Sequence, residues 1–145
     1  MFVLIVGCGR VGSAIANSML AEGHEVSVLD EDAEAIALLE RGQTAGWEER
    51  GGRFTEGTAL EIDALLAAGI EQADAFVAST DGDNTNLVIA QIAKRRFEVE
   101  RVVVRVLDPA RAELHRHPHE EVPDAVLPLE KHRARQNLFL VLEDR

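Results

Sequence analysis

The sequence is poor in two residue types that carry much of the chemistry of proteins. It contains one cysteine, Cys8, and no tyrosine among its 145 residues. A lone cysteine cannot form an internal disulfide, which is consistent with a reducing compartment. The lack of tyrosine excludes the tyrosine-dependent mechanism of short-chain dehydrogenases.

Positive charge is also scarce in this chain. It has 15 lysines and arginines against 26 aspartates and glutamates, for a formal net charge of -11 at pH 7. A free-standing nucleic-acid binder would have to overcome repulsion from the phosphate backbone, so we expect no nucleic-acid partner. Basic runs at residues 94–96 and 131–135 fall in helical patterns, and we interpret them as solvated helix faces.

The apolar stretch at the start of the sequence is short. Residues 2–6 have no positive region before them and run directly into glycine, so they are too short for a secretory signal or a membrane span. We therefore expect a cytoplasmic protein without direct membrane insertion. The length and a hydrophobic content of 46% suit a single domain with one substantial core.

Short apolar runs alternate with longer helical patterns along most of the chain. This alternation predicts an α/β fold, specifically a Rossmann-like doubly wound parallel sheet with crossover helices. Residues 42–52, around Trp47, have the composition of a loop. The expected strands cover residues 2–6, 25–29, 53–55, 75–79 and 101–107, and the expected helices cover residues 11–22, 33–41, 60–68 and 84–96.

The strongest local signal is the glycine motif Gly7-Cys8-Gly9-Arg10-Val11-Gly12, which follows a strand and opens a helix. In this context the first glycine permits a tight turn, the second lets backbone amides approach a pyrophosphate, and the third lets helix and strand pack closely. The helix N-terminus adds unpaired N–H groups and a partial positive charge. We therefore expect these residues, Val11 included, to bind the phosphates of a nucleotide.

Asp30 ends the second expected strand, at the distance from Gly12 that such motifs prefer. Its carboxylate can accept hydrogen bonds from ribose hydroxyls and would repel a 2′-phosphate, which favours NAD(H) or an unphosphorylated adenosine ribose over NADP(H). Arg10 could pair with a terminal phosphate, which suits ATP or ADP as well as NAD, or it could face solvent. In a purely structural alternative, the glycines only pack the turn and Asp30 caps the next helix.

A second group of candidate residues follows the fourth expected strand. Thr80 and Asp81 lie at the carboxyl edge of the sheet, where ligands of such folds bind, although helix capping alone could explain these residues. Arg105 alternates with apolar residues of the fifth strand. It either points a charge into the same crevice or is an ordinary exposed arginine.

Other reactive residues do not form a convincing catalytic centre. His115, His117 and His119 lack the spacing of a zinc protease and any thiolate partner, so we interpret them as part of a solvated loop. Cys8 is better explained as a small packed side chain than as a redox sensor. Because the nucleotide-binding pattern uses almost the whole chain, little remains for a substrate pocket. We expect no enzyme; the alternative is a small NAD-dependent oxidoreductase or the cofactor-binding half of one.

The end of the sequence differs in pattern from the rest. Residues 110–115 could form a short helix, residues 115–123 read as a polar loop, and residues 129–142 read as an amphipathic terminal helix. We therefore expect a Rossmann-like nucleotide-binding domain over residues 1–128 and a C-terminal crossover or interface helix over residues 129–145.

Taken together, these motifs resemble the N-terminal domain of the regulators of potassium conductance, also called the RCK, KTN or TrkA-N domain. The fourth-strand motif is more specific than the glycines, because generic dehydrogenases do not share it. The matching segments are residues 6–12, 28–30, 76–81, 83–87, 104–109 and 123–130.

The resemblance implies a non-enzymatic regulatory subunit that binds NAD(H), ADP or ATP and gates a potassium uptake system or channel. It also implies a homodimer or a higher ring assembly, attached to an integral-membrane potassium transporter or channel subunit at the inner face of the cell membrane. By position, Gly9, Arg10 and Gly12 would hold phosphates and Asp30 the ribose. Thr80, Asp81 and Arg105 would line the site, and Thr58 and Ala59 would contact adenine, where Gly57-Thr58 replaces the family's usual acidic residue.

Overall fold

The structure is a computed structural model that describes residues 1–107 and 138–142, without the side chains of residues 138 and 140. Within these residues the chain alternates between strands and helices, as the periodicity predicts. The strands are β1 (Phe2–Val6), β2 (Glu25–Asp30), β3 (Arg53–Glu56), β4 (Ala75–Ala78), β5 (Arg101–Val106) and β6 (Leu138–Leu142). The helices are α1 (Arg10–Ala21), α2 (Ile36–Glu40), α3 (Ile62–Ala68) and α4 (Asp83–Arg95), with 3-10 turns at Ala33–Ala35 and Ile70–Gln72.

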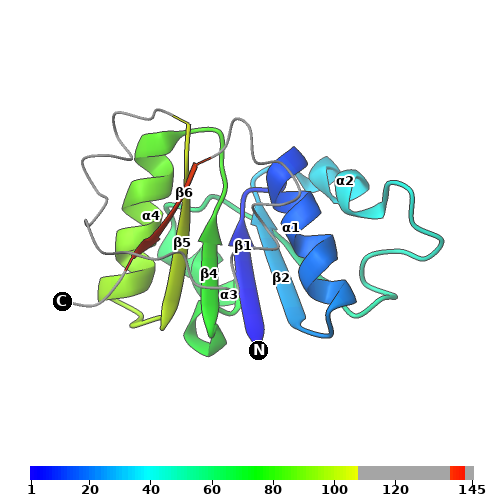
Figure 1. The fold of residues 1–145 in the computed structure, drawn as a ribbon, viewed down its shortest axis with the longest axis horizontal. Helices are drawn as coiled ribbons and strands as arrows, with labels where there is room; N and C mark the ends of the chain where they lie inside the picture. Colours follow the sequence, from blue (N-terminus) through cyan, green and yellow to red (C-terminus); the bar gives the residue numbers. More distant parts are fainter. Residues whose placement is uncertain (108–137, 143–145) are drawn as a thin grey trace.

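The six strands form one sheet in the order β3-β2-β1-β4-β5-β6 (Figure 1). Strands β1 to β5 are parallel, and β6 runs antiparallel to β5. The chain starts at β1 in the middle of the sheet, winds outward to β3, and then crosses to β4 and β5. The strand order reverses between β1 and β4, which is where doubly wound folds bind their ligands. The predicted Rossmann-like fold class is confirmed.

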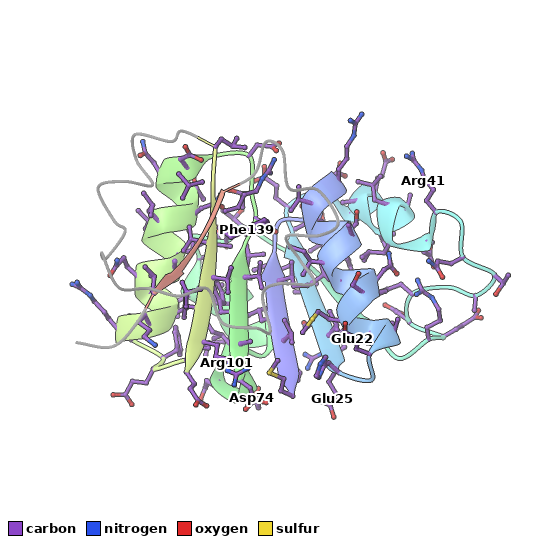
Figure 2. All side chains as sticks on the ribbon, viewed as in Figure 1. Glu22, Glu25, Arg41, Asp74, Arg101 and Phe139 are labelled. Atoms are coloured by element: carbon purple, nitrogen blue, oxygen red, sulfur yellow. The ribbon has the colours of Figure 1, made fainter. Side chains whose placement is uncertain are left out.

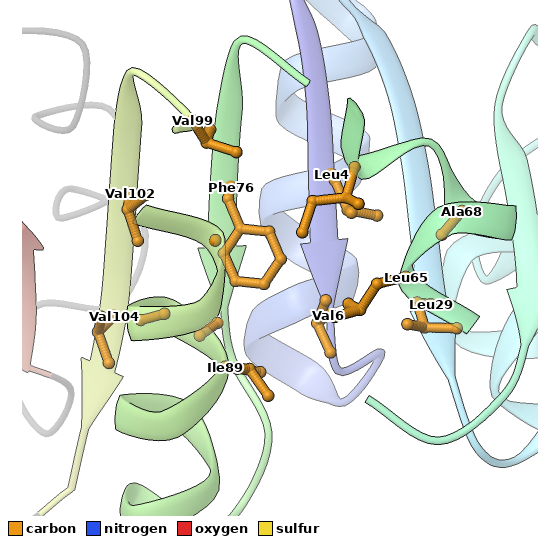
Figure 3. Packing of buried hydrophobic residues seen from close by; sticks show 14 of the residues in the cluster. Leu4, Val6, Leu29, Leu65, Ala68, Phe76, Ile89, Val99, Val102 and Val104 are labelled. Carbon is orange, nitrogen blue, oxygen red and sulfur yellow. The ribbon is translucent and has the colours of Figure 1, made fainter. Parts of the chain in front are cut away.

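Both faces of the sheet are covered, which explains why its central strands are continuous apolar runs. On one face, Leu4 and Val6 of β1 pack with Phe76 of β4 and with side chains from α3 and α4. Figure 3 shows the Phe76 ring in this core, on the same face as Leu65 of α3 and Ile89 of α4. On the other face, a second buried cluster joins alternate residues of β1 to α1 and α2. Neither cluster can form without the sheet between them.

Helix α3 shows how the sequence ends a helix at a defined residue. Its C-cap is Gly69, with φ of 96°, in the left-handed region that glycine adopts without a steric penalty. Gly23, two residues after α1, has φ of 93° for the same reason. The sequence-based bounds of α1, α3 and α4 agree with the observed ones to within two residues, whereas α2 begins three residues later than predicted, after the 3-10 turn at Ala33–Ala35.

The terminal helix predicted over residues 129–142 is wrong for the part that the structure describes. Residues 138–142 form strand β6, with Leu142 opposite Val102 and Leu138 opposite Val106. The pattern of five consecutive apolar residues fits a buried strand as well as a buried helix. As a strand they serve both cores, because Leu142 packs on one and Phe139 and Val141 pack on the other. Residues 108–137, with the predicted helix at 110–115 and the histidine cluster, lie outside the described residues.

The loop between α2 and β3 is a packed structure around Trp47. The Trp47 side chain is completely buried, and its indole Nε1 donates to the carbonyl oxygen of Arg53 at 2.9 Å. Its backbone N–H donates to Glu40 Oε2 at 2.8 Å. The Arg50 guanidinium lies over the indole ring and donates to Asn17 Oδ1 and to the carbonyl oxygen of Leu39. These contacts attach the loop to α1 and α2.

One basic side chain does not lie on a solvated face, contrary to the sequence-based interpretation. Lys94 is 8% exposed, and its ammonium group donates to the carbonyl oxygen of Glu100 at 2.9 Å and to that of Val99 at 3.4 Å. The charge therefore lies over the turn between α4 and β5. Arg95 and Arg96 are exposed, as expected.

Candidate functional site

A pocket of about 690 Å³ lies at the carboxyl edge of the sheet, at the switch between β1 and β4. This volume is within the range of small-molecule sites, about 300 to 1,000 Å³. The opposite edge carries charged residues at the starts of strands, and Figure 2 shows Glu25, Asp74 and Arg101 there. At that edge the Asp74 carboxylate accepts a hydrogen bond from the backbone N–H of Phe2 at 2.7 Å. The pocket is lined by residues 6–9, 29–32, 34, 35, 38, 57–60, 79–82 and 85.

The three glycines of the motif have three different surroundings. Gly7 has φ of +101°, and a Cβ there would lie 2.6 Å from the backbone carbonyl of Ser79. A Cβ on Gly12 would overlap the carbonyl oxygen of Gly7 and lie 2.9 Å from Ser79 Oγ. A Cβ on Gly9 would meet no atom within 4 Å. The first and third glycines therefore permit close packing, while the second leaves open space at the pocket wall.

The N-terminus of α1 begins beside this open space. Its N-cap is Gly9, in extended conformation, and no side chain caps the helix or places an acidic group in its first turn. The first amide groups of a helix have no partner inside it, and they carry about half a positive charge. An anionic group in the pocket would find donors here.

Asp30 lies at the end of β2 on the next side of the pocket. Its Oδ2 accepts from the backbone N–H of Cys8 at 2.7 Å, and its Oδ1 accepts from that of Asp32 at 2.8 Å. Each carboxylate oxygen has a further acceptor site, so Asp30 can still bind a hydroxyl group. The two bonds fix the carboxylate relative to the glycine turn.

Cys8 belongs to the packed structure of this wall. Its side chain is 2% exposed, and Sγ lies 3.4 Å from the carbonyl oxygen of Ala35. Burial, and secondly the charge of Asp30, raises the pKa of the Cys8 thiol to about 12. The thiolate needed for redox chemistry is thus strongly disfavoured, and the interpretation as a small packed side chain is confirmed.

The far side of the pocket is formed by the loop after β4 and held by Asn86 of α4. The Thr80 hydroxyl lies 2.6 Å from Asn86 Oδ1. The Nδ2 group of Asn86 donates to the carbonyl oxygen of Arg105 at 3.0 Å. Arg105 Nη1 lies 3.8 Å from Asp81 Oδ1. Sequence reasoning did not assign a role to Asn86, because its position in the first turn of a helix suggested capping alone.

The structure brings most of the predicted site residues together and leaves some outside. Four of the predicted residues do not line the pocket. Arg10 is exposed, and Val11 packs in the core. Gly12 packs closely against the carbonyl group of Gly7, and the Arg105 guanidinium lies 3.8 Å from the Asp81 carboxylate. The predicted residues that do line it are Gly7, Gly9, Asp30, Thr58, Ala59, Thr80 and Asp81.

Further lining residues were not predicted. Glu31, Asp32 and Glu34 follow β2 and add carboxylates to the rim, and Leu38 of α2 and Leu60 add apolar surface. Glu31 and Asp32 could have been found from their position directly after β2, which ends at this edge, whereas no such signal marks Leu38 or Leu60. Among the lining residues, all of which the structure describes, none is lysine or arginine.

Neither a metal site nor a membrane-spanning helix is present among the residues that the structure describes. No group of three or more histidine, cysteine, aspartate or glutamate side chains in this part could hold a metal ion. None of the helices described is both long and apolar enough to cross a bilayer.

The strand order, the glycine turn and the acidic residue ending β2 define a domain of the Rossmann-type dinucleotide-binding fold class. Comparison with known families then gives a specific assignment. Residues 3–126 match the family model of the TrkA-N domain, so this chain belongs to the TrkA-N domain family. The resemblance stated from the motifs is confirmed.

Curated relatives support the same assignment. The chain is 42% identical over 115 residues to the Trk system potassium uptake protein TrkA of Streptomyces coelicolor, covering 79% of this chain and 48% of that protein. It is 29% identical over 114 residues to the TrkA homolog of Pyrococcus abyssi, covering 79% and 47%. The chain therefore spans about half the length of the curated relatives it matches.

Solved structures share the fold. The Kef CTD of Shewanella denitrificans in an AMP-bound form superposes with a TM-score of 0.64 at 24% identity, covering 79% of this chain and 65% of that one. The TrkA-N domain of the inner membrane protein ybaL from Escherichia coli gives a TM-score of 0.58 at 23% identity, covering 70% and 69%.

Proposed function

We propose that this domain binds an adenine nucleotide with an unphosphorylated ribose, NAD(H) or ATP/ADP, and regulates a potassium uptake system or channel through that binding. The observation that carries the proposal is the pairing of two complementary groups on one pocket wall. The uncapped N-terminus of α1 offers donors, and the fixed carboxylate of Asp30 offers acceptors. A nucleotide requires both, for its phosphates and its ribose.

Each part of such a ligand has a matching surface. Phosphates fit the open space at Gly9, ribose hydroxyls fit Asp30, and the base fits the surface that includes Thr58 and Ala59. Arg10 directly follows Gly9 and is exposed at the start of α1; it does not line the pocket, and its proposed role is to pair with a terminal phosphate that extends beyond the pocket. The AMP bound to the similarly folded Kef CTD supports an adenine nucleotide as ligand.

The domain acts without catalysis in this proposal. The described lining residues include no histidine or lysine, and burial raises the pKa of the Cys8 thiol to about 12, which disfavours it as a nucleophile. The relatives are named as potassium uptake proteins. The oxidoreductase alternative predicts NADH turnover with a simple carbonyl or hydroxy acid, lost in Asp30→Ala.

The partners proposed are a second copy of this chain, in a homodimer or a larger ring, and an integral-membrane potassium transporter or channel subunit at the cytoplasmic face of the membrane. The names of the relatives support the membrane partner. A nucleotide can shift such an assembly only if it binds the two states with different affinities.

Thermal unfolding with NAD, NADH, NADP, ATP, ADP, AMP and cyclic di-AMP tests the binding site. A correct ligand at a hundredfold excess over its Kd should stabilise the fold by about 2.7 kcal/mol. Asp30→Ala should remove most of that gain, whereas Asp63→Ala, at an exposed aspartate of α3, should retain it. Stabilisation by NADP equal to that by NAD, or a full gain in Asp30→Ala, would contradict the assigned role of Asp30.

A further inference from the structure

The carboxamide of Asn86 connects the loop after β4 to the end of β5. Asn86 is completely buried in the first half of α4. Its Nδ2 donates to the carbonyl oxygens of Thr80 and Arg105, each at 3.0 Å. Its Oδ1 accepts from the backbone N–H of Thr80 at 2.9 Å and lies 2.6 Å from the Thr80 hydroxyl.

The backbone partners fix which way this carboxamide faces. Carbonyl oxygens only accept and backbone N–H groups only donate, so the atom facing the two carbonyls is the nitrogen and the atom facing the Thr80 N–H is the oxygen. The Thr80 hydroxyl therefore donates its one proton to Asn86 Oδ1. The alternative acceptor, the carbonyl oxygen of Gly82, is 3.4 Å away and cannot compete with a contact of 2.6 Å.

A hydroxyl group has one proton and two lone pairs. Once the proton is committed to Asn86, Thr80 Oγ1 can only accept, and one lone pair receives the Gly82 N–H at 3.3 Å. Thr80 lines the pocket, and we infer that the second lone pair of its hydroxyl oxygen receives a ligand donor. Asp81 beside it carries a fully exposed carboxylate, which also accepts. This side of the pocket therefore presents acceptors.

We propose that Asn86 is a positioning residue that makes Thr80 a hydrogen-bond acceptor, so that the β4 side of the pocket selects a ligand hydroxyl and rejects a phosphate. This inference rests on the proposed nucleotide function. The strand order β2-β1-β4 places Asp30 and Thr80 on opposite sides of the glycine turn. A diphosphate with a sugar at each end matches acceptors at both sides, whereas a third phosphate would bring its oxygens against acceptors.

Dissociation constants for ADP-ribose, ADP and ATP, measured by isothermal titration calorimetry, test this selection. In the unmodified protein ADP-ribose should bind about fivefold or more tighter than ADP, the effect of one hydrogen bond, and ATP should bind more weakly than ADP. Thr80→Val should make ADP-ribose and ADP equal, while Thr80→Ser should keep the preference. Asn86→Ala frees the Thr80 proton, so the disadvantage of ATP against ADP should shrink. Gln91→Ala, at another amide on α4, should change neither ratio.

The ratios between ligands separate positioning from a general loss of structure, which would weaken all three ligands alike. Equal affinities for ADP-ribose and ADP in the unmodified protein, or a preference that survives Thr80→Val, would overturn this inference alone. No binding of any of the three would overturn the proposed function together with it. If Asn86→Ala does not fold, the comparison of Thr80→Val with Thr80→Ser still decides the matter.

Discussion

Alanine at two glycines of the same turn should have opposite consequences. In Gly12→Ala the new Cβ overlaps the carbonyl oxygen of Gly7, which is backbone and cannot turn away, and lies 2.9 Å from Ser79 Oγ. In Gly9→Ala the new Cβ meets nothing within 4 Å, and Gly9 has φ of -87° and ψ of -158°, which alanine adopts readily. The first change should therefore damage the fold and the second should not.

The magnitudes follow from the kind of contact. Overpacking of a buried site costs about 1 to 3 kcal/mol, and one against rigid backbone belongs at the upper end. For a chain of this size that corresponds to a fall in Tm of roughly 6 to 12 °C. Gly9→Ala removes freedom from the unfolded chain, which favours folding by about 0.4 to 1 kcal/mol, but alanine is a poorer N-cap than glycine by a similar amount, so the net change in stability should be small. Its methyl group occupies the space proposed for phosphate, so nucleotide affinity should fall by about tenfold or more.

Far-UV circular dichroism melts of both variants, each with and without the best-stabilising nucleotide, measure fold and binding on the same samples. Gly12→Ala should melt early, whereas Gly9→Ala should melt close to the Tm of the unmodified protein but gain little from nucleotide. A Gly12→Ala protein as stable as the unmodified one would refute the packing role of Gly12. Full stabilisation of Gly9→Ala by nucleotide would refute phosphate binding at Gly9.

Three other changes have defined outcomes. Trp47→Phe leaves the carbonyl of Arg53 without its 2.9 Å donor and should lower the free energy of unfolding in urea by about 2 kcal/mol; an unchanged value would contradict the role of this bond. Asp30→Asn replaces one acceptor of a backbone N–H by an amide donor, so calorimetry should show lost stability, by about 1 to 3 kcal/mol, and weaker nucleotide binding. The pKa of Cys8 is about 12 in the fold against an ordinary 9.0, so the unfolded chain loses this proton first, and stability should fall as pH rises from 9 to 12. Urea titrations across that range should show a smaller fall for Cys8→Ala, and equal slopes would contradict the burial of the thiol.

The fold was predictable because its signals are local. The apolar strands buried on both faces, the glycines after α1 and α3, and the glycine turn before α1 each follow from a few adjacent residues. Strand β6 was mistaken for the end of a helix, because five apolar residues fit either structure. Only their position beside β5 and between two cores decides for a strand.

The pocket was predictable in outline and less so in its side chains. That Asp30 and Thr80 lie at the same edge of the sheet was predictable, because Asp30 ends β2 and Thr80 follows β4. The role of Asn86 depends on the carbonyl of Arg105, nineteen residues away, and no sequence pattern contains that contact. Lys94 was assigned to a solvated face because its neighbours are basic, whereas the carbonyl oxygens of Val99 and Glu100, in the turn before β5, accept from its ammonium group and hold it inside.

The packed loop around Trp47 has a spectroscopic consequence. Trp47 is the one tryptophan of the chain, and it does not line the pocket. It is nevertheless attached to α2 through Glu40, and Leu38 of that helix does line the pocket. NADH can quench the indole by energy transfer without contact, whereas ATP, ADP and NAD do not absorb at the wavelengths of indole emission. With these three ligands, a change in emission on binding therefore reports a change around Trp47, which is attached to α2. The fluorescence of Trp47 can therefore be used to test whether binding of ATP, ADP or NAD moves the helix beside the site.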